Sequence, residues 1–200
     1  MADKFIDMIN GVPTLKTPLG SSAGSGDAGK IPKLDSGGKL DASMMPSIGL
    51  FSAMAILEDQ KSDGTNGGAF SSGAWRTRDL NTEVSDAAGI VSLSANQFTL
   101  SAGTYLILCE APGYYINRHK AAIYNVTDSS YAAYGQSSYC SGVPAASTTA
   151  TVSTVLTIGG TKAFELRHRC ETTNATTGFG PASSFGVIEV YSRVTIYKMQ

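Results

Sequence analysis

The stretch QFTLSAGTYLILCEA, residues 97–111, decides the fold of this 200-residue chain. Two runs rich in aromatic and β-branched residues flank the turn signal at 101–103, which is the pattern of two strands joined tightly. The run 105–109 is apolar on both faces, so both faces of this strand need cover. We therefore expect an opposing sheet on one face and a neighbouring subunit on the other.

Similar signals continue from residue 50 to the end of the chain. Short apolar and β-branched runs separated by Gly, Asn and Ser predict about ten strands and almost no helix, which is typical of a sandwich or barrel. In the last run, alternation predicts Val190 and Val194 on one face and Tyr191 and Arg193 on the other. The expected strands are residues 50–58, 74–80, 90–93, 97–100, 104–111, 120–126, 131–137, 149–158, 163–170 and 187–197.

Connection lengths predict where the loops lie. If consecutive strands alternate in direction, every second connection emerges at the same end of the sandwich. We therefore expect the long loops at one end, and the C-terminus beside the first strand at the other. The tight connections are residues 101–103, 127–130 and 159–161, and the long ones are 112–119, 138–148 and 171–186.

Aromatic and small polar residues gather in these long loops. A rigid ring supplies contact area at low entropic cost and can stack on a sugar face, which is typical of recognition surfaces. We expect the loops to bind a glycan or protein on a cell surface, and the alternative is that the rings fold back and pack the loops. The candidate residues are Tyr114, Tyr115, Asn117, Arg118, Tyr139, Thr172, Asn174, Phe179 and Phe185.

Before residue 48 the sequence changes character. Residues 20–41 are rich in Gly, Ser and Lys and cannot build a core alone, so a partner must order this arm. Two related units begin at Gly29 and Gly38, and their prolines favour an extended chain with apolar side chains along it. We expect three copies to wind around one axis and bury these side chains. The arm residues expected at this interface are Ile31, Leu34 and Leu40.

The first residues form a separate segment. Phe5, Ile6, Met8 and Ile9 would share one face of a short helix, which Asn10 and the following Gly would end. A segment this short is not helical unaided. We expect a docking peptide that fits a groove on a larger structure, with a frayed terminus as the alternative.

Composition restricts the class of protein. Charged residues make up 16% of the chain, against roughly 25% in an ordinary soluble domain, so we expect surfaces that further subunits cover. The formal net charge of -1 gives no electrostatic reason to expect nucleic acid or an anionic membrane as partner. No apolar run approaches the ~18 residues of a membrane span, and the N-terminus lacks the apolar core of an export signal.

Catalytic and metal motifs are missing from the sequence. It contains no Gly-x-Ser-x-Gly elbow, phosphate loop or His-Glu-x-x-His motif, and its scattered acids are not coupled as in a glycan depolymerase. His168 and Cys170 share a strand face, but no close Cys or His pair completes a zinc site. We expect a noncatalytic protein without cofactor or metal, in which these two side chains are simply buried. The odd number of cysteines, three, is typical of free thiols in a reducing cytoplasm.

Five residues of the β region are candidates for contacts between subunits. Arg76, Arg78 and Asp79 beside Trp75 suggest a cluster of stacking and charge between subunits, with ligand binding as the alternative, and the other three candidates come from predicted strands. The candidates are Trp75, Arg76, Tyr105, Ile107 and Tyr191.

Four segments carry a resemblance to a known family: GAWRTRDLN (73–81), FTLSAGTY (98–105), RHKAAIYN (118–125) and EVYSRVTIY (189–197). They resemble the C1q and TNF-like jelly-roll domain, in the version found at the ends of bacteriophage fibres and related bacterial proteins. The run GKIPKLDSGGKLDASMMP (29–46) resembles the segment that precedes the terminal domains of many such fibres. Since these domains are homotrimers, the resemblance implies a trimer. The collagen-like Gly-X-Y stalk of the animal proteins is absent, so kinship with their immune functions is not implied.

The sequence thus predicts an all-β C1q/TNF-like jelly-roll head at residues 48–200, an extended trimeric arm at 20–47 and a particle-docking peptide at 1–19. The resemblance implies a bacteriophage virion fibre protein, made in the bacterial cytoplasm, that attaches to the host surface through its distal loops. Its expected partners are further copies of itself, another virion protein and a bacterial surface glycan or protein. The alternative is a structural fibre without a receptor that decorates the capsid or braces the tail, which the short arm favours.

Overall fold

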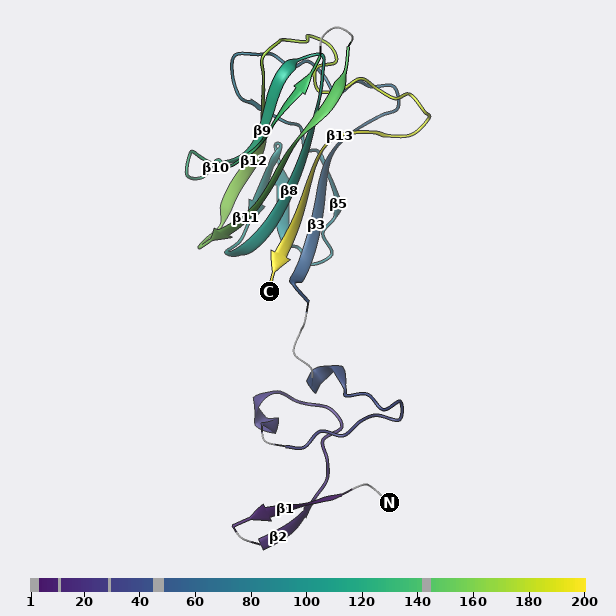
Figure 1. Ribbon diagram of the computed structural model, residues 1–200, viewed down its shortest axis with the longest axis vertical. Helices are drawn as coiled ribbons and strands as arrows, with labels where there is room; N and C mark the ends of the chain where they lie inside the picture. The colour runs from purple at the N-terminus through teal and green to yellow at the C-terminus, as the bar shows by residue number, and fades with distance from the viewer. Residues whose placement is uncertain (1–3, 11, 29, 45–48, 142–144) are drawn as a thin grey trace. The chain divides into compact units, whose positions relative to one another are not determined.

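A computed structural model describes residues 4–10, 12–28, 30–44, 49–141 and 145–200 (Figure 1). The chain divides into two compact units, residues 1–49 and 50–200. Among the described residues, no helix has the length and apolar character that crossing a membrane requires.

The larger unit consists almost entirely of β-strands joined by turns and loops. The strands are β3 (Phe51–Lys61), β4 (Arg76–Thr77), β5 (Thr82–Ser85), β6 (Val91–Ser94), β7 (Gln97–Leu100), β8 (Gly103–Tyr114), β9 (Asn117–Asn125), β10 (Ser130–Cys140), β11 (Ser147–Ile158), β12 (Lys162–Cys170) and β13 (Glu189–Met199).

These strands form two antiparallel sheets packed face to face (Figure 1). The front sheet has the order β11-β8-β13-β3-β5, and the back sheet has the order β10-β9-β12-β7-β6 with β4 beside β12. Most neighbours are far apart in sequence because the chain crosses repeatedly between the sheets, as it does in a jelly roll. The predicted all-β jelly-roll fold is confirmed.

The main core fills the space between the two sheets. Tyr105 and Ile107 from β8 and Ile196 from β13 meet Phe98 and Phe164 of the back sheet, whose rings stack at 5.6 Å. Full burial of one such side chain stabilises the fold by about 1.5–3 kcal/mol.

The expectation that Tyr105 and Ile107 contact another subunit is wrong. Both side chains have an exposed fraction of 0% within one protomer, because strand alternation turns them toward the opposing sheet. Their neighbours Leu106 and Leu108 take the outer face of β8, and Leu108 remains 36% exposed. The run is therefore apolar on both faces, as the sequence indicates, but the residues available to a partner are the alternate ones.

An irregularity in β13 changes the expected faces of this strand. The pairing of β13 with β3 shifts register between Val190 and Arg193, which is a β-bulge that turns Tyr191 and Ser192 both inward. The Tyr191 hydroxyl donates a hydrogen bond of 2.7 Å to the carbonyl of Thr65. Tyr191 is thus committed inside its own protomer and is not available to the predicted subunit interface, while Val190 is exposed.

The loops gather at one end of the sandwich, as predicted. Backbone hydrogen bonds join Tyr114 to Gly178 at 3.1 Å and Thr172 to Ile116 at 3.0 Å. The end of β13 lies beside the start of β3 at the opposite end (Figure 1). A further connection that the sequence did not place, residues 62–75, joins the loop end through a bridge between Phe70 and Asn174.

Some strand bounds differ from the prediction. The connection after β8 is a tight turn, because β8 extends to Tyr114 and β9 begins at Asn117, with positive φ angles of 55° at Tyr115 and 58° at Asn117. In the predicted strand at 74–80 only Arg76–Thr77 pairs, and the next side chain, Arg78, is fully buried. The short strand β5 was not predicted.

The smaller unit begins with a hairpin in place of the predicted helix. Strand β1 (Phe5–Ile9), which contains Met8, pairs antiparallel with β2 (Val12–Lys16), and Asn10 adopts a positive φ of 51°. An Asn-Gly pair between two apolar runs favours a tight hairpin turn, and here this local signal outweighs the helical spacing. The helix prediction is wrong for this reason.

The remainder of the smaller unit has little regular structure. It contains two short 3-10 turns, η1 (Ser25–Asp27) and η2 (Ala42–Met44). The Leu19 backbone donates a hydrogen bond to the carbonyl of Ile31 and accepts one from the amide of Lys33. The arm residues Ile31, Leu34 and Leu40 are exposed by 49%, 56% and 39% in the single chain, and their burial in a trimer stays a prediction.

Candidate functional site

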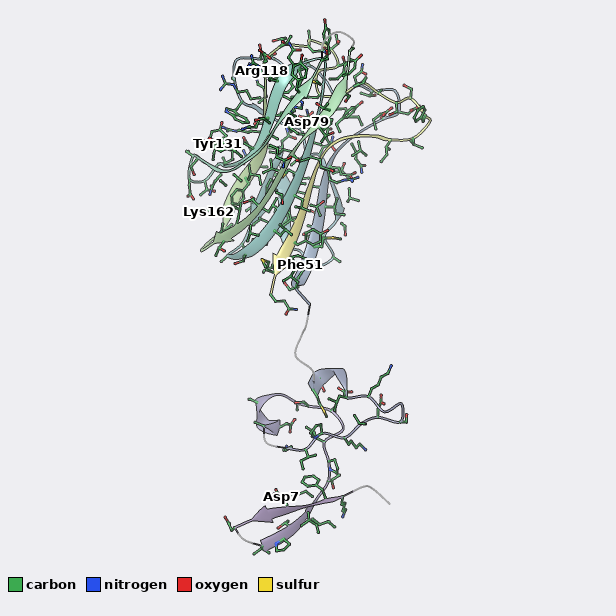
Figure 2. All side chains as sticks on the ribbon, viewed as in Figure 1. Asp7, Phe51, Asp79, Arg118, Tyr131 and Lys162 are labelled. Carbon is green, nitrogen blue, oxygen red and sulfur yellow. The ribbon has the colours of Figure 1, made fainter. Side chains whose placement is uncertain are left out.

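The outer face of the back sheet carries a cationic surface near the loop end. Lys120 of β9 lies opposite Arg169 of β12 in the antiparallel register. Their neighbours in sequence, His119 and His168, are buried beneath the sheet, so Lys120 and Arg169 project outward. Figure 2 labels Arg118 near the loop end and Phe51 at the opposite end of the unit.

A cavity of about 580 Å³ opens on this face and is called here the cationic cavity. Its walls come from the loop before β4, from the start of β9, from β10 and from the end of β12. The lining residues are Ser72, Gly73, Trp75, Arg118, His119, Lys120, Ser137, Ser138, Arg169, Cys170 and Glu171.

The charges around the cationic cavity are unequal in number. Three cationic side chains line it against one carboxylate, Glu171. Arg118 donates hydrogen bonds to that carboxylate from two nitrogens, and its Nε lies 2.9 Å from Oε2 of Glu171. These hydrogen bonds from Arg118 lower the pKa of Glu171 to about 2. Among the described residues, Lys120 and Arg169 form no ion pair, so the cavity has an excess of positive charge at neutral pH.

Aromatic rings support the Trp75 wall of the cavity. The Trp75 ring lies 5.2 Å from that of Tyr131 and 6.0 Å from that of Tyr134, and these two tyrosines stack on each other at 5.0 Å. The Arg167 guanidinium lies 3.4 Å from the Tyr124 ring centre, and its Nε donates to Glu165 at 2.8 Å. Trp75 therefore packs on rings of its own protomer, and the subunit contact expected at this half-buried residue stays a prediction.

Two hydrogen-bonded histidines lie under the cavity floor. His119 Nδ1 is 2.9 Å from His168 Nε2, and His119 Nε2 is 2.7 Å from the Thr148 hydroxyl. Burial and the nearby charge of Arg78 lower the pKa of His119 to about 4 and that of His168 well below its usual value. Both rings are thus neutral at pH 7, and the predicted burial of His168 is confirmed.

A fully buried arginine joins the loops to the sandwich. Arg78 donates hydrogen bonds to the carbonyls of Pro112 at 3.0 Å and Phe179 at 3.3 Å, and it lies 3.9 Å from the Phe179 ring centre. Burial lowers the pKa of Arg78 to about 9, although Asp59 and Asp79 oppose this shift. Sequence reasoning missed this role, and the only signal was an arginine at an inward position of the predicted strand 74–80.

The predicted recognition residues separate into two groups. Tyr115, Tyr139 and Phe185 are exposed by 44%, 58% and 83%, and Arg118 lines the cationic cavity. The others hold the loops together through hydrogen bonds and ring packing, as the alternative interpretation expected. In this second group Asn117 donates to Thr172, Asn174 donates to the carbonyl of Tyr114, and Phe179 packs against Phe70.

Arg76, Lys120 and Arg169 show which information the sequence lacked. Arg76 is exposed and donates through Nε to the carbonyl of Ser71 at 3.2 Å, so its expected contact with a second subunit stays a prediction. Alternation along 163–170 indicates that Arg167 and Arg169 face away from His168, and this is confirmed. The pairing of Arg169 with Lys120 depends on the register of two strands distant in sequence, which alternation does not give.

The potential metal ligands of this region do not form a metal site. Among the described residues, no three His, Cys, Asp or Glu side chains converge on one point. Cys109, Cys140 and Cys170 are buried and unpaired, and burial raises the pKa of Cys170 to about 11.

Solved structures of low sequence identity are similar to the larger part of this chain. No protein family and no curated protein matches the sequence. Murine APRIL at pH 5.0 is 9% identical with a TM-score of 0.48, covering 74% of this chain and 98% of its own. The globular domain of zebrafish complement 1qA is 12% identical with a TM-score of 0.41, and the match covers 74% of this chain and 96% of that domain. PRD1 vertex protein P5 is 17% identical with a TM-score of 0.44, and the match covers 76% of this chain and 100% of P5. The jelly-roll assignment rests on the strand order of the two sheets.

Proposed function

We propose that this protein is a bacteriophage virion fibre whose trimeric head attaches, without catalysis, to the surface of a bacterial cell. The observation that carries the proposal is the polarity of the larger unit. Both ends of its chain, at Phe51 and Met199, lie at one end, and the loops lie at the other (Figure 1). A head tethered at Phe51 would present its loops and the cationic cavity away from the tether.

The front sheet supports self-association through an apolar row on its outer face. Met54, Tyr197, Leu106 and Val155 are paired in register across β3, β13, β8 and β11. Met54 is 39% exposed and Val155 is 55% exposed, so the row is open in the single chain. We assign this face to two further copies of the same chain, because contiguous exposed apolar surface on a soluble protein marks an interface.

The outer face of the front sheet changes character toward the loops. One step away from the apolar row, Leu108 of β8 still offers an apolar side chain. Closer still to the loops, Arg193 of β13 lies between Glu58 of β3 and Glu110 of β8. Its Nη2 atom is 2.6 Å from Oε1 of Glu58. Charged groups at this end would form the rim of a subunit interface, and apolar groups its centre.

The N-terminal hairpin supports a docking role for residues 1–19. Ile6 of β1 pairs with Leu15 of β2, and these side chains are 70% and 58% exposed. A two-stranded hairpin is marginally stable alone in water, so cover for this surface would stabilise it. We assign it to another structural protein of the virion, reached by the arm at 20–47, and Phe5 and the rest of β1 belong to this docking surface.

The first test of the proposal is the mass of the full-length protein in solution. We expect three times 20.8 kDa by native mass spectrometry and light scattering. A single protomer at micromolar concentration would overturn the trimer.

The second test is adsorption to cells. Fluorescently labelled full-length protein is expected to stain some strains in a panel of bacteria, and excess unlabelled protein should compete with the stain. If the protein joins phage particles but stains no strain that these particles infect, the structural role without a receptor replaces the attachment role.

A further inference from the structure

We infer that the cationic cavity binds one sugar residue that carries an anionic group, a carboxylate or a phosphate, within a bacterial surface polysaccharide. This inference rests on the proposed attachment function and names the chemistry of the ligand. The sequence singled out Arg118 as a recognition residue but did not indicate a cavity around it, because the walls come from four separate segments.

The size and lining of the cavity suit a single sugar ring with its linkages. Its volume of about 580 Å³ lies within the ~300–1,000 Å³ of small-molecule sites. Trp75 offers an aromatic wall against which the apolar face of a pyranose can stack, and the Tyr131 ring holds that wall in place. Ser137 offers a hydroxyl group that can both donate to and accept from sugar hydroxyls, and the Ser138 hydroxyl, which donates to the carbonyl of Thr149 at 3.4 Å, can accept from one.

The charges select an anionic sugar over a neutral one. Arg118 is already paired with Glu171, so it holds the rim of the cavity in place. Lys120 and Arg169 face each other across two paired strands and have no acidic partner among the described residues. A carboxylate or phosphate between these two cations would receive charge-assisted hydrogen bonds, and a guanidinium can bind either group with two parallel bonds.

The position of the cavity fits a ligand that belongs to a long chain. It opens on the outer face of β9, β10 and β12, and exposed Tyr139 lies beside it, opposite Arg118 in the register. A polysaccharide lying across this face would place one anionic residue in the cavity, with Tyr139 available to a neighbouring residue.

The experiment is a titration of the full-length protein with three probes: glucuronate, glucose 6-phosphate and glucose. Isothermal calorimetry at low salt measures affinity, and amide chemical shifts locate the site. We expect at least one anionic probe to bind about tenfold or more tightly than glucose, because charge-assisted bonds separate them. The stronger anionic probe identifies the anionic group.

Variants test which side chains carry the binding. Lys120→Gln and Arg169→Gln should each weaken the preferred anionic probe about tenfold and leave glucose unchanged. Lys39→Gln removes a positive charge from the smaller unit and is the matched control, with unchanged affinity expected. Equal affinity for anionic and neutral probes, no binding at millimolar concentration, or full affinity in both cavity variants would overturn the inference.

Adsorption to cells separates this inference from the proposed function. If the Lys120→Gln and Arg169→Gln double variant stains bacteria as well as the unaltered protein, attachment stands and the ligand chemistry is wrong. If the unaltered protein binds an anionic sugar yet stains no susceptible strain, the cavity assignment stands and the attachment role fails.

Discussion

The two sheets of the sandwich obey the same alternation but carry opposite chemistry on their outer faces. The front sheet presents Met54, Leu106 and Val155 in one apolar row, while the back sheet presents Lys120 and Arg169 beside aromatic rings. Burial alone does not distinguish them, because both faces are open in the single chain. Their chemistry does: the apolar face suits more copies of the chain, and the cationic face suits a charged ligand.

Placing a charge in the apolar row would have the largest effect on this comparison. Leu106→Asp should convert the proposed trimer to single protomers, because desolvating a carboxylate at a closed interface costs several kcal/mol per copy. Native mass spectrometry checks the mass. Tyr139→Asp on the back sheet is the matched control and should remain trimeric. A trimeric Leu106→Asp variant would remove the front sheet from the interface.

Acid should weaken the back sheet through its buried histidines. The pKa of His119 falls to about 4 in the folded protein, so below the unfolded value of 6.5 the unfolded chain binds more protons. The contribution of His119 to the free energy of unfolding is therefore fully present above pH 6.5. It falls by about 3 kcal/mol as the pH is lowered toward 4. Denaturant unfolding between pH 7 and pH 4 measures this loss. His119→Gln should flatten the pH dependence, and an equal slope in that variant would contradict the assignment.

Removing the buried arginine should loosen the loop end and leave the front face intact. Arg78→Leu leaves the carbonyls of Pro112 and Phe179 without their donor, which should lower the free energy of unfolding by about 2 kcal/mol. Urea unfolding gives the stability, and hydrogen exchange shows where protection is lost. If β3 and β13 lose as much hydrogen-exchange protection as residues 171–180, the front sheet depends on the loop end and the prediction is contradicted.

The exposed ion pair should have the smallest effect. At neutral pH, Arg118→Gln should lower the free energy of unfolding only a little, because solvent screens an exposed pair. It should raise the pKa of Glu171 from about 2 toward its ordinary value, since Arg118 is the main cause of the shift. Carboxyl carbon shifts followed by NMR report that pKa. An unchanged pKa would mean that another group stabilises the carboxylate.

Much of the fold could be predicted from the sequence because its causes are local. The strand at 97–100 and the gathering of the loops follow from alternation and from connection lengths. The sequence did not predict that Tyr105 and Tyr191 face inward. For Tyr105, alternation does not say which face of the strand is the inner one. For Tyr191, the bulge in β13 shifts the alternation of side chains between the two faces. At the N-terminus, the Asn-Gly turn signal was present and was given too little weight.

The candidate site was less predictable than the fold. Single-residue chemistry singled out Arg118 and Trp75, but it did not show that Trp75 packs against Tyr131 and Tyr134, which lie more than 50 residues away. The cationic cavity depends on the register of β9 with β12, which requires long-range pairing that no local pattern specifies. Sequence alone therefore located the loop end and missed the cavity on the adjoining sheet face.

Hydroxyl-radical footprinting of the full-length protein, read by mass spectrometry, tests most directly whether the two faces differ in solution. Met54 and Tyr139 are both open in the single chain, at 39% and 58%. If further copies cover the front sheet, Met54 will be protected while Tyr139 is oxidised freely. Oxidation of Met54 at the rate seen in the unfolded chain would contradict the account.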